Sequence, residues 1–379
     1  MAFRACAQTV AVLPLFNLTE KQNLDWIGES VAESVREALA AEGILALDRD
    51  SREEAYRRLS LRPHAVLTRA SVVRLGEMLD VERVVYGSFQ VSPAPGQPDS
   101  LSLAIRVLDL RELRQSPEES VTSSLEDLTE AQVRLSWQAL RLLSEPGTAP
   151  PEGEFLRRHK GVRLDALESY IRGLMAPSPE QKHRFFTQAV RLDETFSQPC
   201  FELGRLLVGT KDYKGAAGWF ERVPAESPRY LEARFFLGLC RYQLGEYERA
   251  VASFRAVADT VPLSEVWNNL GAAQSRGNMP GAVESFRKAS EGDPHDPAYL
   301  FNLGYALWKN SEFEAAAEKF RASLDLAPED PLAILMLGRC LKGTPVRETE
   351  QRIKGLERIK DNFEEQAYRQ LRATLERRK

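Results

Sequence analysis

The sequence predicts an α/β domain with a mixed sheet and flanking helices, followed by an all-α superhelix of stacked helical hairpins. Two observations support this division. In the second half of the chain, Leu-Gly pairs recur with a period close to 34 residues. In residues 8–143, apolar runs of strand length alternate with amphipathic helical segments. A chain of 379 residues is long enough to hold both domains.

The period can be counted from its most constant positions. Successive Leu-Gly pairs stand 34, 33, 33 and 34 residues apart, and four of them are followed by an Ala, a Phe and a Pro in fixed phase. Gly and Ala let two helices approach closely, Phe fills the space beside them, and Pro cannot continue the helix that it follows. We therefore expect two helices in each period. The pairs are Leu203-Gly204, Leu237-Gly238, Leu270-Gly271, Leu303-Gly304 and Leu337-Gly338, and the triplets are Ala216/Phe220/Pro228, Ala250/Phe254/Pro262, Ala282/Phe286/Pro294 and Ala316/Phe320/Pro328.

These positions, with Trp267 three residues before its Leu, resemble the tetratricopeptide repeat family. The resemblance covers residues 158–346, of which the first repeat is degenerate. It implies a superhelix whose first helices line a concave groove that holds a protein partner. For residues 347–379 we expect one or two capping helices, since their apolar residues are spaced as an inward stripe. That stripe is Ile353, Leu356, Ile359, Phe363, Tyr368 and Leu371.

The elements of the first domain follow from local patterns. The apolar run from Val10 to Phe16 predicts a strand that is buried on both faces. A helix capped by Asp25 and closed by Gly43 follows, with apolar residues at four-residue spacing. The remaining predicted elements are a strand at 44–47, a helix with a capping box at Ser51 and Glu54, a helix opened by Thr68, an antiparallel pair of strands at 83–91 and 101–107, a weaker strand at 121–125 and a helix at 128–143.

The order of four segments resembles the TolB-type N-terminal α/β domain, which is related to FlgO and CsgG-like modules of the bacterial envelope. The segments are VAVLPLFN, WIGESVAESVREAL, LGEMLDVERVVYGSF and LSLAIRVLDL, within residues 8–112. The resemblance implies a role in periplasmic assembly or protein contacts, or a place between a regulator and a helical repeat array. It brings no enzymatic activity. Residues 144–157 are rich in Pro and Gly and are interpreted as a linker.

Charge and apolar runs limit the partners. A net charge of -4 and a pI near 5.8 argue against nucleic acid, which calls for a basic surface. No apolar run is long enough to span a membrane. Ala5-Cys6-Ala7 is similar to the end of a secretory leader, although a chance triplet of small residues explains it equally simply. Cys200, Cys240 and Cys340 are interpreted as buried small residues, so cysteine does not decide the compartment. We expect a periplasmic location, with the cytoplasm as the alternative.

A search for chemistry finds no phosphate loop, no dinucleotide-binding motif, no nucleophile elbow and no metalloprotease motif. The four histidines, at His64, His159, His183 and His295, have no ligand partners at metal-binding spacing. We therefore expect no catalytic residue, no metal and no cofactor.

A binding groove remains. The face of each first helix opposite its Leu-Gly pair is expected to line this groove, and its aromatic residues would supply most of the affinity for an extended peptide or a partner helix. The alternative is that these aromatic residues pack between adjacent hairpins. The candidate residues are Phe201, Arg205, Val208, Phe235, Leu239, Tyr242, Asn268, Ala272, Ser275, Phe301, Asn302, Tyr305, Trp308, Leu335, Arg339 and Lys342.

Two details qualify the groove. Phe235 and Phe301 stand where a carboxylate clamp would need Lys, so recognition of a C-terminal carboxylate is not expected. The face with Asn268, Ala272 and Ser275 is the smallest and most polar, and there a partner backbone could approach and be hydrogen-bonded. The sequence therefore predicts a non-enzymatic bacterial scaffold, with envelope assembly as its expected setting. A sensor or output module with a ligand in the α/β domain is the alternative, and an enzyme with an unrecognised site is a third. The sequence does not indicate an oligomeric state.

Overall fold

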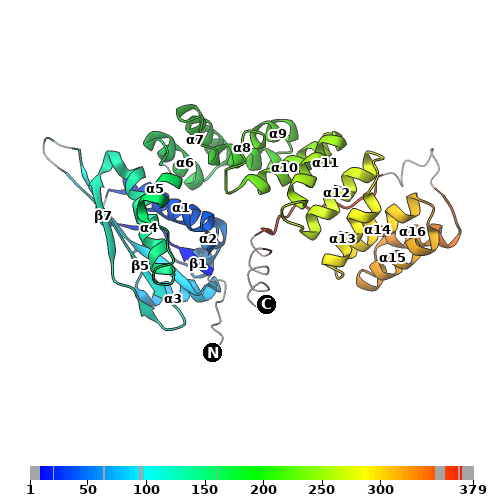
Figure 1. Cartoon of the computed structure of the whole chain (residues 1–379), viewed down its shortest axis with the longest axis horizontal. Coiled ribbons are helices and arrows are strands. Elements are labelled where there is room, and N and C mark those ends of the chain that lie inside the picture. The colour runs from blue at the N-terminus through cyan, green and yellow to red at the C-terminus, as the bar shows by residue number, and fades with distance from the viewer. Residues whose placement is uncertain are drawn as a thin grey trace. The chain divides into compact units, whose positions relative to one another are not determined.

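The computed structural model describes residues 9–19, 21–62, 65–93, 96, 98–159, 161–345, 355–365 and 368. These residues form two compact units, and the boundary between them falls between Pro199 and Cys200. The first unit holds the sheet and the first helical hairpin, and the second unit holds the later hairpins (Figure 1). Within the described parts of the chain, no helix is both long enough and apolar enough to cross a membrane.

The described residues of the first unit form a mixed sheet, as predicted, and this sheet has seven strands where the sequence indicated five. The strand order is β3-β1-β4-β5-β6; β2 also pairs with β4, and β7 with β5. β1 pairs in parallel with β3 and β4, and β2 pairs in parallel with β4; β5 is antiparallel to β4, β6 and β7. The strands are β1 Thr9–Val12, β2 Phe16–Asn17, β3 Leu45–Ala46, β4 Arg83–Ser92, β5 Ser100–Asp109, β6 Arg114–Gln115 and β7 Glu119–Ser124.

The β4–β5 ladder is the longest in the sheet and confirms the predicted antiparallel pair. It pairs ten residues of each strand, from Arg83 opposite Asp109 to Ser92 opposite Ser100. The two backbones are closest at Gly87, where a Cβ atom would collide with the carbonyl group of Ala104. A residue without a side chain is therefore required at this point of the ladder.

Helices cover the sheet. α1 and α4 contact each other, and α4 also contacts β5 and β7. α2 and α3 contribute Ala55, Val72 and Leu75 to an apolar cluster with Leu13 and Val84 of the strand region. The bounds are η1 Gln22–Leu24, α1 Asp25–Ala41, α2 Arg49–Arg58, α3 Arg69–Met78, η2 Leu125–Asp127 and α4 Leu128–Leu143.

The helix caps agree with the sequence in one case and differ in two. Thr68 caps α3 as predicted, since its hydroxyl accepts the Ser71 N–H. α2 begins earlier than the predicted cap at Ser51, because the Asp48 carboxylate accepts the Ser51 N–H at 2.8 Å. Asp is as good an N-cap as Ser, so the first suitable residue in the chain starts the helix. Asp25 is the first residue of α1 rather than its cap, and it accepts a hydrogen bond from Asn17.

The stretch predicted as a linker contains a short helix, α5 Glu152–Arg158. Its Phe155 is fully buried, and Trp137 of α4 donates to the carbonyl oxygen of Pro150 at 2.9 Å. α6 Leu164–Met175 and α7 Pro179–Leu192 then form a hairpin at the position of the degenerate repeat. A Cβ atom at Gly173 would lie 2.5 Å from the Phe186 ring.

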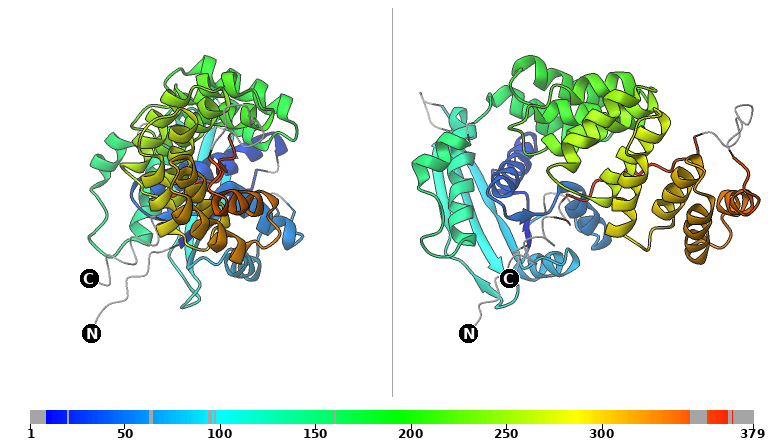
Figure 2. Two further views of the ribbon diagram at one scale, coloured as in Figure 1. Left: turned by 90° about the vertical axis from the view of Figure 1, so that its right-hand side faces the viewer. Right: turned by 45° about the vertical axis from the view of Figure 1, so that its right-hand side comes forward.

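The second unit is a series of helical hairpins. The first helices α10, α12, α14 and α16 contact one another in sequence, and α11, α13 and α15 each contact the first helix that follows them. Figure 2 shows these hairpins following one another from green to orange. The helices are α8 Gln198–Gly209, α9 Tyr213–Phe220, α10 Tyr230–Gln243, α11 Tyr247–Ala258, α12 Ser264–Arg276, α13 Ala282–Gly292, α14 Pro297–Lys309, α15 Phe313–Leu326 and α16 Pro331–Leu341.

The Gly and Phe positions of the period meet inside each hairpin. A Cβ atom at Gly204, Gly238, Gly271 or Gly304 would lie 2.6, 2.7, 2.8 and 3.2 Å, respectively, from the ring of the Phe on the paired second helix. Real Cβ contacts are longer, so the Gly lets the ring lie against the backbone of the first helix. The rings, all of them buried, are Phe220, Phe254, Phe286 and Phe320.

Beyond α16, residues 355–365 again lie against the repeats. Residues 355–364, called the C-terminal segment below, form neither helix nor strand. Leu356, Ile359 and Phe363 nevertheless pack against the core of the second unit. The sequence predicted capping helices in residues 347–379; no helix forms at 355–364, and most of the other residues in that range lie outside those described. Figure 2 shows the segment in red-orange.

Candidate functional site

The C-terminal segment lies on one face of α12 and α14, which carries three fully buried amides: Asn268, Asn269 and Asn302. We call these residues the asparagine face. Asn is a poor residue for a helix interior, because its side chain competes for backbone hydrogen bonds. A buried amide also has to find partners for its donors and its acceptor. The partners of this face are backbone groups of the C-terminal segment.

Two amides each hold both backbone groups of one residue. Asn302 accepts the N–H of Arg358 at 2.9 Å and donates to its carbonyl oxygen at 2.8 Å. Asn269 accepts the N–H of Lys360 at 2.8 Å and donates to its carbonyl oxygen at 2.7 Å. Asn268 adds a second donor to the carbonyl oxygen of Arg358, at 2.7 Å. Alternate residues of the segment are thereby paired with side chains, in the way that a strand is paired with its neighbour.

The side chain of Glu357 enters a polar pocket that we call the carboxylate pocket, made by Ser275, Arg276 and Lys309. The Glu357 side chain is fully buried. Its Oε1 accepts from the Ser275 hydroxyl at 2.6 Å and lies 3.9 Å from the Lys309 ammonium, while Oε2 lies 3.0 Å from Arg276 Nε. Arg276 and Lys309 are the last residues of α12 and α14. Helix C-terminal ends repel anions, so these cations are what makes a carboxylate acceptable there.

The side chains that follow Glu357 make ion pairs and aromatic contacts with the repeats. The Arg358 guanidinium lies 3.7 Å from the centre of the Phe301 ring and pairs with Asp330. Lys360 pairs with Asp296, and the rings of Phe363 and Phe235 are 5.1 Å apart. The ring contacts add cation–π and aromatic attraction to the backbone bonds.

The start of the segment is fixed by its own backbone. Gly355 donates its N–H to the Tyr305 hydroxyl at 3.2 Å, and its carbonyl oxygen accepts from Arg276 at 3.0 Å. Gly355 has a φ of +73°. Residues other than Gly rarely adopt this backbone, so the position also depends on Gly.

Burial perturbs several ionisable groups around the carboxylate pocket. It raises the pKa of Tyr242 and of Tyr305 to about 12, and the nearby Glu357 carboxylate adds to both shifts. Burial lowers the pKa of Lys309, and the attraction of Glu357 opposes this change. Burial raises the pKa of Glu265, whose carboxylate accepts the N–H of Glu364 at 2.9 Å.

The structure brings together six of the residues predicted for the groove, one of which is Ser275 of the carboxylate pocket. Phe235, Asn268, Phe301, Asn302 and Tyr305 all contact the C-terminal segment. The segment is part of the same chain and not a partner, so the structure does not show a partner at these residues.

Several other predicted groove residues contact the rest of the repeat array, whereas Leu335 is exposed. Trp308 is buried and donates to the carbonyl oxygen of Thr344 at 2.9 Å, and Leu239 lies in the core. Phe201 packs against Phe220 and Phe236, next to Arg205. Tyr242 packs against Tyr247, and the Arg276 guanidinium lies 5.9 Å from the centre of its ring. The Arg339 guanidinium lies 6.0 Å from the centre of the Trp308 ring.

Sequence reasoning missed Asn269, Arg276 and Glu265. Asn269 had a usable signal: like Asn302, it immediately precedes the Leu of a Leu-Gly pair. The cations Arg276 and Lys309 also stand at matching places, five residues after the Gly of their pairs. Their role depends on Glu357, which is more than 45 residues away, so no local pattern indicated it.

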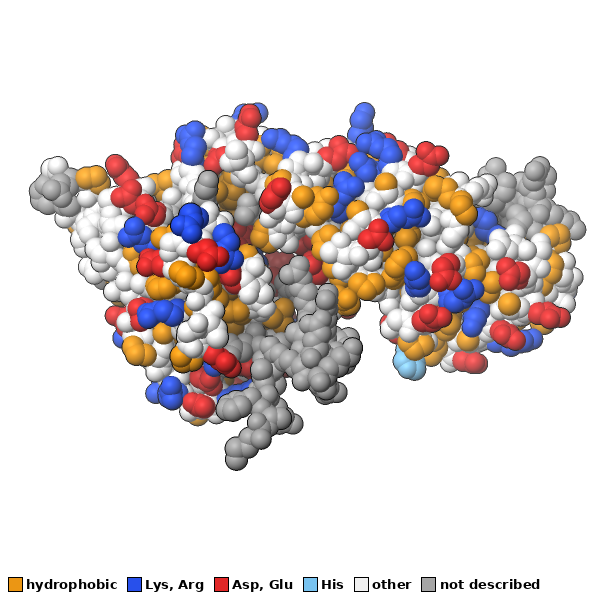
Figure 3. All heavy atoms as spheres, in the orientation of Figure 1, with side chains coloured by type: hydrophobic (Ala, Val, Ile, Leu, Met, Phe, Trp, Pro, Cys, Tyr) orange, Lys and Arg blue, Asp and Glu red, His pale blue; other side chains and the backbone are white. Residues whose placement is uncertain are grey.

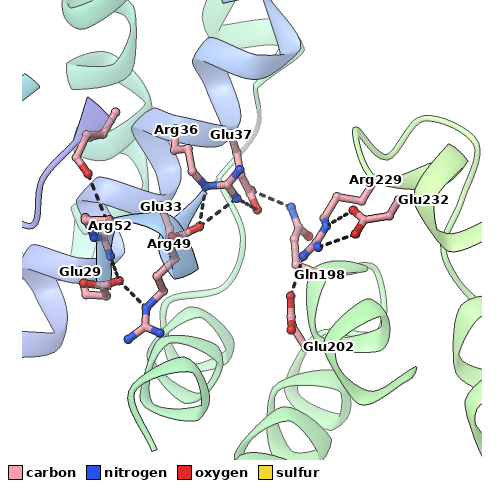
Figure 4. A network of polar contacts seen from close by, with 11 residues as sticks. Glu29, Glu33, Arg36, Glu37, Arg49, Arg52, Gln198, Glu202, Arg229 and Glu232 are labelled. Carbon is pink, nitrogen blue, oxygen red and sulfur yellow. Dashed lines mark hydrogen bonds and ion pairs between the residues drawn. The ribbon is translucent and has the colours of Figure 1, made fainter. Parts of the chain in front are cut away.

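The first unit contains a second buried polar cluster, shown in Figure 4. Glu29 of α1 pairs with Arg49 and Arg52 of α2, and Arg52 also donates to the Val12 carbonyl oxygen at 3.1 Å. Burial raises the pKa of Glu33, but attraction to Arg36 and then to Arg52 outweighs it and keeps this pKa below the usual value. Charges of both signs are matched here, so the cluster ties α1 to α2 and β1.

A shallow hollow of about 340 Å³ lies in the same unit, between the start of α1 and the α6–α7 hairpin. Trp26, Arg172, Arg184 and Phe185 are among its lining residues. Over the described residues, no group of three or more His, Cys, Asp and Glu side chains could hold a metal ion. Cys200, Cys240 and Cys340 are buried free thiols, as the sequence indicated. On the face seen in Figure 3, acidic and basic side chains are interspersed.

Comparison with known proteins supports the nature of the repeats. The tetratricopeptide repeat model matches residues 201–265 and 272–331, about a third of the chain. The chain therefore contains tetratricopeptide repeats. The match does not extend to residues before 201, so the TolB-type resemblance stays a prediction. No protein with a curated description matches this chain.

Several solved structures are similar to the repeat part. YrrB, described as a tetratricopeptide repeat protein with an unusual peptide-binding site, is 20% identical with a TM-score of 0.43, over 45% of this chain and 91% of its own. MamA from Desulfovibrio magneticus RS-1 is 24% identical with a TM-score of 0.39, over 42% and 92%. The Pseudomonas aeruginosa protein pilF is 19% identical with a TM-score of 0.38, over 45% and 78%. Each similarity covers less than half of this chain.

Proposed function

We propose that this protein is a non-catalytic interaction scaffold whose repeats bind an extended segment of a partner protein at the asparagine face. The observation that carries the proposal is the way in which Asn269 and Asn302 pair with both backbone groups of Lys360 and Arg358. An amide side chain offers a donor and an acceptor together, so it can pair with any residue whose backbone is extended. The face is thus built to hold a polypeptide through its main chain.

The burial of the asparagine face supports the same function. Below, the hydrogen bonds of its amides to the backbone of the segment are called the clamp. Asn268, Asn269 and Asn302 are all fully buried beneath the segment. In this covered state the amides are removed from water, and their hydrogen bonds to the segment backbone compensate for that removal. A polypeptide backbone therefore satisfies the polar groups of this face.

A peptide selection tests this function. A library of random dodecapeptides is selected against the full chain, and the enriched peptides are then measured on an Asn269→Ala, Asn302→Ala variant. We expect peptides with affinities in the micromolar range that bind the variant at least about tenfold more weakly, because four backbone bonds are lost. Circular dichroism confirms that the variant keeps its helices. A failure to enrich any peptide, or equal binding to both proteins, contradicts the proposal.

For the biological setting, we propose assembly of the bacterial envelope, with the protein in the periplasm. This proposal rests on the resemblance of residues 8–112 to the TolB-type domain. Cell fractionation with a tagged full-length protein tests it. Recovery in the cytoplasm would instead favour a sensor or output module of a signalling system.

A further inference from the structure

We propose that the C-terminal segment is an internal copy of the partner's binding motif, and that a partner displaces it by placing a Glu or Asp side chain in the carboxylate pocket. This inference rests on the proposed function and adds the chemistry of the partner. The segment shows which side chain the pocket accepts, since the Glu357 side chain is fully buried there.

The backbone clamps cannot select a sequence, because Asn269 and Asn302 contact only main-chain atoms of the segment. Selection has to come from a side-chain contact. Of the described segment residues, Glu357 makes the most enclosed polar contacts, with one hydroxyl and two cations around its carboxylate.

An acidic side chain suits this pocket better than a neutral one. Hydrogen bonds to charged groups are roughly twice as strong as bonds between neutral groups. The Lys309 ammonium donates to the carbonyl oxygen and the hydroxyl of Ser275, at 2.7 and 3.1 Å. It is therefore held at the pocket by α12 whether or not the segment is present. A neutral occupant would not form an ion pair with this cation or with Arg276.

The position of the carboxylate also fixes the register. Glu357 directly precedes Arg358, the first clamped residue, and Phe363 contacts Phe235 six positions after Glu357. A partner segment is thus expected to carry an acidic residue just before its first clamped residue. It should also carry an aromatic residue six positions after that acidic residue. Basic residues between them would meet Asp330 and Asp296, as Arg358 and Lys360 do.

The test uses the full chain and a fluorescent peptide with the sequence of residues 354–366. The chain competes with the peptide through its own segment, so weakening that segment raises the apparent affinity for the peptide. We expect Glu357→Gln in the chain to tighten peptide binding about tenfold, and the same change in the peptide to weaken its binding to that variant about tenfold. Fluorescence anisotropy measures both.

The matched control is Asp361→Asn. It makes the same change of charge four residues later, on an exposed side chain. Neither the chain nor the peptide with this change should differ from the wild type. If Asp361→Asn acts as strongly as Glu357→Gln, the effect is one of net charge, and the role of the pocket is refuted.

A measurement on the unmodified protein does not depend on whether the variants fold. The amides of Arg358 and Lys360 are followed by hydrogen exchange in ¹⁵N-labelled chain, with and without excess unlabelled peptide. Displacement predicts faster exchange with the Glu-containing peptide and no change with its Gln counterpart.

The outcomes separate the two proposals. Peptide binding that is equal for Glu and Gln leaves the peptide-binding function standing and overturns the acidic motif. Absence of binding to every form of the chain, including Glu357→Gln, overturns both.

Discussion

Two stretches of this chain satisfy their backbone groups in different ways. In the sheet, β4 and β5 pair backbone with backbone over ten residues. In the second unit, the C-terminal segment pairs its backbone with amide side chains of α12 and α14. The sheet uses groups that every residue carries, whereas the clamp uses a few chosen side chains.

The two arrangements differ in the kind of substitution that breaks them. A backbone ladder survives most side-chain changes, and it is broken where a new Cβ atom cannot fit. The clamp is weakened when one of its amides is removed. We therefore expect the clamped segment to open more readily than a central strand.

The largest expected effect is a loss of stability of the sheet. In Gly87→Val, the new side chain collides with the Ala104 backbone, and the strands have to separate locally. We expect a loss of about 3 kcal/mol or more in the stability of the first unit, measured by hydrogen exchange of β5 amides. Ser102→Ala, on the facing strand, is the control and should change stability by less than about 0.5 kcal/mol. Similar exchange in the Gly87 variant and the wild type would show that the ladder tolerates a side chain there.

The next effect breaks the clamp. Asn302→Ala removes two bonds to Arg358 and one to Asn268. We expect the free energy that holds the segment to fall by about 2–3 kcal/mol, so that the Arg358 amide exchanges roughly 30- to 150-fold faster. The β5 amides should be unaffected. Asn310→Ala, on an exposed residue just after α14, serves as the control. An unchanged Arg358 amide would mean that the remaining contacts hold the segment without the clamp.

The smallest effect concerns pH. The pKa of Tyr305 is raised to about 12 in the folded protein, above the ordinary value near 10. A raised pKa means that its contribution to stability is complete below pH 10 and is lost as the pH rises through about 12. Between pH 10 and 11 the wild type should lose up to about 1.4 kcal/mol more than Tyr305→Phe. Urea unfolding followed by circular dichroism at both pH values measures this difference. Equal losses in the two proteins would contradict it.

The hairpins could be predicted from the sequence because their determinants are local and repeated. Gly271 and Phe286, for example, stand 15 residues apart and meet inside one hairpin, and the same pair occurs in neighbouring periods. The β4–β5 pair was predictable for a similar reason, since alternating apolar residues lie on both sides of a short loop.

The C-terminal segment was not predictable in this way. Leu356, Ile359 and Phe363 are spaced as they would be on one face of a helix, which favoured capping helices. Phe363 instead contacts Phe235, far earlier in the chain, and the clamp stabilises a non-helical backbone that local propensity does not encode. Asn268 and Asn302 were recognised as groove residues, but the sequence could not indicate that the chain itself would occupy them.

Because the occupant is covalently attached to its own site, dilution of the protein does not release it. Attached segments act at effective concentrations that are often in the millimolar range. A free partner with the same intrinsic affinity must exceed that concentration before it occupies half of the sites. Partners that bind weakly therefore do not occupy the site. Under the displacement proposed above, a partner at ordinary cellular concentration has to bind more tightly than the segment that it replaces, or to deliver its own segment while it is already held elsewhere on the protein.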